Sequence, residues 1–216
     1  MNCMMKQGTV PAAEKGQQNV MNTSAEVQRI LEIEVTSDGT WKQANATICG
    51  KTGICQVTWW TSDDPGALQS GQLVHCDWLN RLEFDNGALV VQGLSLVEAI
   101  DPDVNLIDTV PACWLPPATG SGNCVVQSFR QLWSQLSRPM RAWFNALFWH
   151  QPERWERFLK GPASIGFHHA RKHGLFTHSV DCAMRSLRAA QGDELVNVDV
   201  LLMASLRKRV AKSSCG

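Results

Sequence analysis

One stretch decides how the second half of this chain folds: Phe167-His168-His169-Ala170-Arg171-Lys172-His173-Gly174-Leu175-Phe176-Thr177-His178-Ser179. It holds four of the chain's six histidines and leads into an apolar-periodic run, Val180, Ala183, Met184 and Leu187. Spacings of three and four predict a helix with one buried face. His178 falls on that face, followed by Asp181 at i+3 and Cys182 at i+4. Because neutral imidazole is the commonest metal ligand, the cluster suggests a metal site. A competing interpretation, that these are helix-entry and surface histidines, stays open.

Further helices are predicted on both sides of this stretch. Residues 125–136 place apolar side chains on one face, Pro139 and Pro152 stand where two more helices begin, and Gly161-Pro162 ends the second of them. A last helix is expected over residues 197–206, apolar on enough sides to be packed all round. The aromatic residues at helical spacing are interpreted as core and not as a cofactor site; they include Phe129, Trp133, Trp143, Phe144, Phe148, Trp155 and Phe158.

The first half of the chain has the pattern of strands. Alternating or apolar runs separated by turn signals such as Asp85-Asn86-Gly87 predict five strands. A short helical turn is expected at residues 65–70, between the third strand and the fourth. That order is typical of the OB-fold, a small barrel that binds oligonucleotides. The strands are predicted at residues 27–35, 41–48, 54–60, 73–84 and 88–97.

These patterns predict an α+β protein of two units. An OB-like barrel over residues 25–100 is followed by a linker, 101–123, with four prolines, and by a helical unit over 124–216. Residues 1–24 are rich in polar and small side chains and are expected to be a disordered tail, with Met21 as an alternative start.

Composition excludes some classes of protein. The chain is 44% hydrophobic and 19% charged over 216 residues, and no apolar run approaches the roughly 20 residues of a membrane span. The first 20 residues lack a secretory apolar core, so a cytoplasmic location with no membrane partner is expected. Eight cysteines are spread singly, without a Cys-x-x-Cys pair, which favours reduced, core-filling thiols.

Aromatic residues of the barrel are candidates for binding single-stranded nucleic acid. OB-folds stack bases on aromatic rings and follow phosphates with cations, and the candidates here are Trp41, Lys42, Trp59 and Trp60. Trp59 and Trp60 are adjacent and must face opposite ways in a strand, so at least one of them lies outside the barrel. Residues 27–100 carry four basic and nine acidic side chains, so binding should be weak.

The pattern His-His-Ala-x-x-x-Gly-Leu-x-x-His-Ser, from His168 to Ser179, with the lead-in Gly161-Pro162-Ala163-Ser164, resembles the opening of bacterial HD-type metal-dependent phosphohydrolase domains. With the barrel in front, the chain most resembles the 3′–5′ exoribonucleases that carry an OB-fold before the HD domain. The HD-like domain of conjugative relaxases is the second-best match. The helical unit would then be an incomplete HD-type domain.

The resemblance implies a hydrolytic site that uses a divalent cation, Mn²⁺ or Mg²⁺, to activate water. His178 matches the family's first metal-ligating histidine, and His168 and His169 match paired histidines at the lip of the site. Arg171 and Lys172 adjoin them as candidate phosphate contacts. Neither a His-Asp dyad nor a distal aspartate follows His178 in the expected pattern, since the chain reads Leu206-Arg207-Lys208-Arg209 where the dyad is expected. One ligand of four is then present, and stable metal binding is not expected.

Three hypotheses follow from the sequence. The first is a truncated, inactive HD-family protein that retains a nucleic-acid-binding barrel and associates with itself through helix 197–206, left without cover in a loosely packed helical unit. The second is an active metal-dependent nuclease with unrecognised ligands such as His173, His178 and Asp181. The third is a protein-interaction module built on the acidic barrel.

Overall fold

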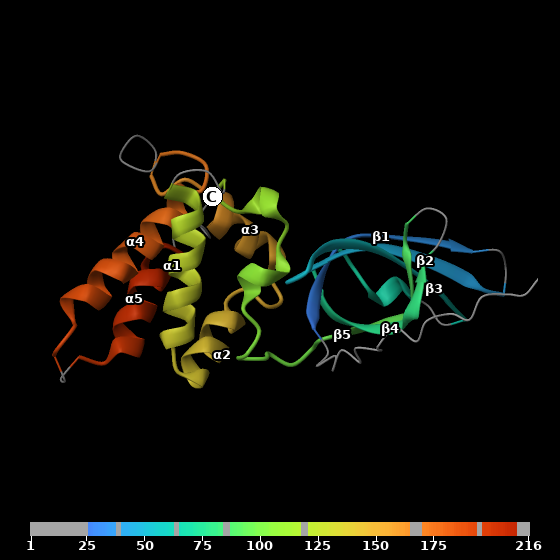
Figure 1. The fold of residues 1–216 in the computed structure, drawn as a ribbon, viewed down its shortest axis with the longest axis horizontal. Coiled ribbons are helices and arrows are strands. Elements are labelled where there is room, and N and C mark those ends of the chain that lie inside the picture. Colours follow the sequence, from blue (N-terminus) through green and yellow to red (C-terminus); the bar gives the residue numbers. More distant parts are fainter. Residues whose placement is uncertain are drawn as a thin grey trace, which may run out of the picture.

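The structure of this protein is a computed structural model, drawn in Figure 1, with the barrel and the helices side by side along the long axis. The candidate residues His168 and His169, and the tail predicted over residues 1–24, lie outside the described residues. The structure describes residues 26–37, 40–62, 65–83, 87–117, 121–164, 170–193 and 196–210.

The described residues of the first half form a closed five-stranded barrel in the order β1-β2-β3-β5-β4, with β1 returning to β4. A short 3-10 helix, η1 (Pro65–Ala67), lies between β3 and β4, inside the segment where a helical turn was predicted. The sequence prediction of five strands in this half, and of the α+β class, is confirmed. The strands are β1 (Val27–Ser37), β2 (Lys42–Gly50), β3 (Gly53–Thr61), β4 (Leu73–Glu83) and β5 (Leu89–Leu96).

Large and small side chains on facing strands fill the barrel. Trp59 of β3 pairs in register with Ala44 of β2, and Val57 pairs with Ala46. All four side chains are buried in the barrel core. The alanines leave room for the indole of Trp59, which explains how so small a barrel holds a tryptophan inside.

A bulge in β1 changes which face its side chains occupy. The sequence alternation placed Val27, Arg29, Ile33 and Val35 on one face, but the register with β2 shifts between Ile30 and Glu32. An inserted residue in one strand moves the following side chains to the other face. Before the shift, Val27 therefore packs outward in the helical core, whereas Ile33, after it, packs against the barrel core. Simple alternation along this strand therefore fails at the bulge.

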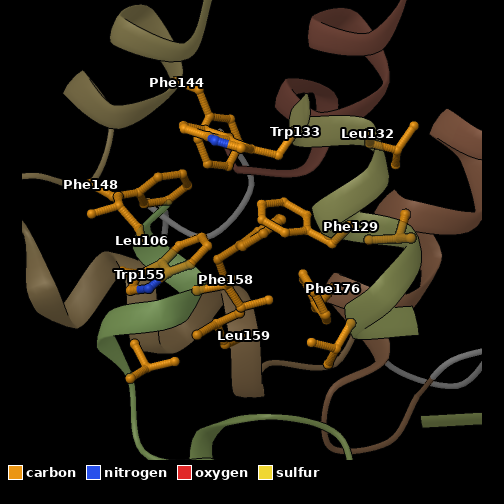
Figure 2. Close-up of a cluster of buried hydrophobic side chains, with 14 of the residues drawn as sticks. Leu106, Phe129, Leu132, Trp133, Phe144, Phe148, Trp155, Phe158, Leu159 and Phe176 are labelled. Atoms are coloured by element: carbon orange, nitrogen blue, oxygen red, sulfur yellow. The ribbon is translucent and has the colours of Figure 1, made fainter. Parts of the chain in front are cut away.

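The second half is helical, as predicted, with the expected prolines in the first turns of α2 and α3. Its described helices pack around a cluster of aromatic rings, shown in Figure 2. Trp155 lies at its centre, with its ring centroid 4.8 Å from that of Phe148 and 5.6 Å from that of Phe158. The helices are α1 (Ser121–Gln135), α2 (Arg138–Ala146), α3 (Pro152–Lys160), α4 (Gly174–Ala189) and α5 (Val198–Val210).

The segment predicted as a linker is part of the packed structure. Within residues 101–117, two 3-10 helices form, η2 (Leu106–Thr109) and η3 (Ala112–Trp114). Leu106 and Ile107 are buried in the same core as the helices. The side-chain amide of Asn145 donates to the backbone carbonyl of Asp101 at 2.7 Å. The prolines therefore indicate an irregular backbone in this segment, but its side chains still pack in the core.

One core joins the barrel to the helices. Val27 of β1 and Leu73 of β4 are buried with the helical aromatic residues, and the indole nitrogen of Trp149 donates to the carbonyl of Val97 at 3.0 Å. We call this contact region the seam. At its centre the Arg29 guanidinium is fully buried and donates to the carbonyl of Gly71 at 2.6 Å and to the hydroxyl of Thr109 at 3.3 Å.

The last helix is covered on one side. Leu202 and Met203 of α5 are buried in the helical core, whereas Val200 is 58% exposed. The described helices cover α5 mainly from α4 and, more lightly, from α2, so Val200 lies on a side without their cover, as expected for a helix left incompletely covered. Self-association through residues 197–206 stays a prediction. Within the described part of the chain, no helix combines the length and apolar character that a membrane span requires.

Candidate functional site

The adjacent tryptophans of β3 face opposite ways, as the sequence predicted. Trp59 is 4% exposed inside the barrel, whereas Trp60 is 43% exposed on its outer face. Trp59 was also proposed as a base-stacking residue, and the structure corrects this, because its ring is enclosed by barrel side chains and offers no face to a ligand. Trp60 is the member of the pair that a base can reach.

A second exposed tryptophan stands beside Trp60. Trp41 is 54% exposed and comes just before β2, two positions from Gln43, which pairs in register with Trp60. Lys42, between them in the chain, pairs with Thr61 and is partly buried. The structure thus brings three of the four predicted barrel residues to one end of the β2–β3 ladder.

Uncharged polar side chains continue the surface beside Trp60. The Gln43 amide lies 3.3 Å from the hydroxyl of Thr58 and 3.4 Å from the side-chain oxygen of Asn45. Asn45 in turn pairs in register with Glu34 of β1, which is exposed. Thr58 itself is buried, and its hydroxyl donates to the Ala44 carbonyl. The amides of Gln43 and Asn45 are therefore the groups that can hydrogen-bond to base edges, while the carboxylate limits how closely a phosphate can approach.

Among the side chains that the structure describes, positive charge is scarce on this surface. Of the barrel's basic residues, Arg29 is buried in the seam and Lys51 lies in the β2–β3 turn, at the other end of those strands from Trp60. Burial lowers the pKa of Arg29 to about 10, and the neighbouring Cys49 opposes that change. Among the described residues, Lys42 is therefore the cation closest in the chain and the register to the exposed rings.

The histidine stretch enters α4 through an unusual backbone. His173 precedes the helix with φ +64°, in the left-handed region, and its ring is buried. Its Nδ1 donates to the Leu159 carbonyl at 2.9 Å. Desolvation by burial lowers the pKa of His173 below its usual 6.5. The ring therefore joins α4 to α3, a structural role that the sequence did not reveal.

The charged residues of the stretch remain available to a ligand. Arg171 and Lys172 are both exposed just before α4. His178 lies one turn inside the helix and is partly buried, with its Nε2 3.5 Å from the Sγ of Cys182. Within the described ranges, no three His, Cys, Asp or Glu side chains come together as a metal-binding set.

The six described cysteines are free thiols. Burial raises the pKa of Cys49 to about 11 and that of Cys76 to about 12, which keeps both protonated at neutral pH. Cys113 and Cys124 are exposed, and Cys182 is partly buried. The expectation of core-filling thiols holds for the two buried cysteines of the barrel.

The structure places the two groups of candidate residues at opposite ends of the molecule. Val27, at the start of β1, packs in the helical core, whereas Ser37, at its end, pairs with Lys42, which pairs with Thr61. A strand of 11 residues extends roughly 35 Å at about 3.3 Å per residue. Trp41 and Trp60 therefore lie at the barrel end farthest from the seam with the helical unit, which carries His178.

Comparison of the chain with protein-family models, with curated proteins and with solved structures gave no match.

Proposed function

We propose that this protein binds single-stranded nucleic acid weakly through the outer face of its barrel, with Trp60 and Trp41 as stacking platforms. The observation that carries this proposal is that both indoles are exposed at the same end of the β2–β3 ladder, Trp60 within it and Trp41 one residue before it. Stacking of a base on an aromatic side chain contributes about 1–3 kcal/mol and requires no particular base.

The strand order supports an OB-type barrel as the context of this site. In OB-folds the ligand surface lies over strands 2 and 3 and the loops between strands 1 and 2 and between strands 4 and 5. Trp60 lies on β3, and Trp41 lies between β1 and β2. Both candidate rings therefore fall where an OB-type surface would bind an oligonucleotide.

Stacking should outweigh phosphate contacts at this surface. In a plot of log K for single-strand binding against log salt concentration, each phosphate contact makes the slope more negative by about 0.7. Lys42 pairs with Thr61 and so alternates to the face opposite Trp60, and we therefore expect a slope no steeper than that of one contact. A basic groove that held the strand through several phosphates would give a much steeper slope.

Binding is tested by fluorescence anisotropy with labelled oligo-dT and oligo-U, each titrated with the full chain at several salt concentrations. Trp60→Ala should weaken binding by about 1–3 kcal/mol, or roughly 5- to 150-fold in Kd. Trp143→Ala is the matched control, because Trp143 is a partly exposed tryptophan on α2 of the helical unit. Unchanged affinity in folded Trp60→Ala and Trp41→Ala variants would rule out this surface.

The resemblance to HD-type exoribonucleases extends the proposal to phosphodiester chemistry, for which we propose that the chain is inactive. The sequence supplies one of the four expected metal ligands, His178. A catalytic site needs about three protein ligands and an open position. Manganese-dependent release of nucleotides from a 3′ end, lost in His178→Ala, would refute this and favour the nuclease hypothesis.

A protein partner is the second candidate for the barrel. Ile54, on the same outer face of β3 as Trp60, is 56% exposed, and Glu32 and Glu34 are exposed on β1. Exposed apolar side chains bordered by charges are typical of protein interfaces. Affinity for neither oligonucleotide, with Trp60 still solvent-accessible to an acrylamide quencher, would favour this alternative.

A further inference from the structure

Two potential metal ligands meet on α4. His178 and Cys182 are four residues apart on this helix, so their side chains lie one above the other on the same face. The Nε2 of His178 and the Sγ of Cys182 are 3.5 Å apart, and both residues are partly buried. In the described chain, Cys182 is the cysteine whose sulfur lies within hydrogen-bonding distance of a histidine nitrogen.

We propose that His178 and Cys182 form a two-ligand site for a thiophilic divalent cation, with Zn²⁺ as the natural candidate. Zinc lies about 2.3 Å from a cysteine sulfur and about 2.0–2.1 Å from a histidine nitrogen. At a tetrahedral angle these bond lengths place the two ligand atoms about 3.5–3.6 Å apart, which matches the 3.5 Å separation already present.

The helix holds this pair in place. Val180 and Ala183, on the adjoining face of α4, are buried in the helical core. Ser179 is buried as well, and its hydroxyl donates to the Leu175 carbonyl at 2.8 Å. Because the helix is fixed in this orientation by packing, the His178–Cys182 pair needs little rearrangement to bind a cation, and less entropy is lost on binding.

Metal binding replaces a proton at this pair. Without metal, the thiol of Cys182 can share its proton with Nε2 of His178 across the 3.5 Å contact. When the cation binds, that proton leaves to solvent, the thiolate and the neutral imidazole each donate an electron pair, and water fills the remaining positions. Asp181, next to Cys182 in the chain, adds negative charge nearby but does not complete a three-ligand set among the described residues.

The ligand chemistry distinguishes this site from the one that the family resemblance implies. Thiolate and imidazole favour zinc and other soft or borderline ions, whereas Mg²⁺ and Mn²⁺ favour carboxylate and water oxygens. The proposed site should therefore bind Zn²⁺ and Co²⁺ but not Mg²⁺, and it requires neither the His-Asp dyad nor hydrolytic activity.

Cobalt gives a direct test, because a thiolate ligand to Co²⁺ produces a charge-transfer band in the near ultraviolet. The reduced, metal-free full chain is titrated with Co²⁺ alone. We expect the band to appear, to be removed by Zn²⁺ and to survive a large excess of Mg²⁺. Cys182→Ser should abolish it, and His178→Gln should raise severalfold the Co²⁺ concentration needed to reach half of the full signal. The matched control replaces the two cysteines that are exposed in the described chain, Cys113→Ser with Cys124→Ser, and should keep the band.

Several results would overturn the proposal: no band in the parent protein, a band that persists in Cys182→Ser, a band that is lost in the control, or equal displacement by Mg²⁺. Circular dichroism verifies that each variant is folded. Should Cys182→Ser fail to fold, the parent protein still provides a test, because Zn²⁺ should slow alkylation of Cys182, mapped by peptide mass, without slowing that of Cys113. Equal alkylation of Cys182 with and without Zn²⁺ would likewise refute the site.

Discussion

Gly71 offers the sharpest test of whether the barrel and the helices form one folding unit. It lies just before β4 with φ +90°, and its carbonyl accepts the guanidinium hydrogen bond of Arg29. A Cβ built on Gly71 would stand 2.5 Å from the Cγ and 2.7 Å from the Cβ of Pro152, the first residue of α3. An alanine at this position would therefore press the barrel against the helical unit.

The cost of Gly71→Ala has two parts. A non-glycine residue at positive φ costs roughly 1–3 kcal/mol. Overpacking against the Pro152 ring adds about 1–3 kcal/mol, because that ring belongs to a packed helix start and cannot swing away. Gly192→Ala isolates the first part, since Gly192 has φ +87° and its added Cβ would meet nothing within 4 Å. We expect Gly71→Ala to lower the free energy of unfolding by about 1–3 kcal/mol more than Gly192→Ala does.

Urea unfolding, followed by tryptophan fluorescence and by far-ultraviolet circular dichroism, measures both variants. Pro152→Ala added to Gly71→Ala should recover part of the overpacking cost, because it removes the Cγ that would lie 2.5 Å from the new Cβ but keeps the Pro152 Cβ at 2.7 Å. A single transition seen by both probes would show that the units unfold together. Equal losses for Gly71→Ala and Gly192→Ala, with no coupling to Pro152, would refute the close contact at the seam.

Two further predictions concern buried groups. The free energy of unfolding should fall as the pH drops below about 6.5. In that range His173 binds a proton in the unfolded state, whereas its lowered pKa keeps it neutral in the folded state. His173→Asn, which tolerates the left-handed backbone, should flatten the dependence of the melting temperature on pH between 7 and 5, and an unchanged slope would contradict this role. At Arg29, the pKa decrease to about 10 corresponds to roughly 3 kcal/mol against the buried charge, which is comparable to its two hydrogen bonds. The free energy of unfolding of Arg29→Met, measured in urea, should therefore stay within about 2 kcal/mol of the parent value. Arg29→Ala should be less stable than Arg29→Met by about 2 kcal/mol or more, because it leaves a cavity. Equal losses in the two variants would show that the hydrogen bonds dominate.

The local sequence patterns predicted the barrel's strands well because each strand carries its own signals. Alternating burial, the Lys51-Thr52-Gly53 turn and the opposite faces of Trp59 and Trp60 are all local properties of the chain. The helices were equally accessible, because apolar spacing and prolines in the first turn, such as Pro152, mark them directly.

Contacts between segments far apart in the chain could not be predicted from those local patterns. The sequence pattern indicates an ordinary polar strand position at Arg29. Its burial depends on two distant groups, the Thr109 hydroxyl on η2 and the Gly71 carbonyl before β4, which accept its hydrogen bonds. Residues 101–117 read as a linker because prolines and short apolar runs carry no period, although Leu106 and Ile107 complete the helical core. The bulge after Ile30 likewise depends on pairing with β2 and left no turn residue as a signal.

The positions of the candidate residues bear on how the resemblance should be interpreted. In an exonuclease of the resembled arrangement, a strand held by the barrel would have to reach the histidine site. Here the Trp60 end of the barrel points away from the seam, roughly a full strand length from the helices. The exposed cations Arg171 and Lys172, just before α4, lie on the helical side, whereas exposed carboxylates lie near the rings on β1. The exposed rings and the exposed cations are therefore separated in this molecule. Under the proposed function, a short oligonucleotide bound by Trp60 should gain little from the helical cations, and only a strand long enough to pass the seam could use both.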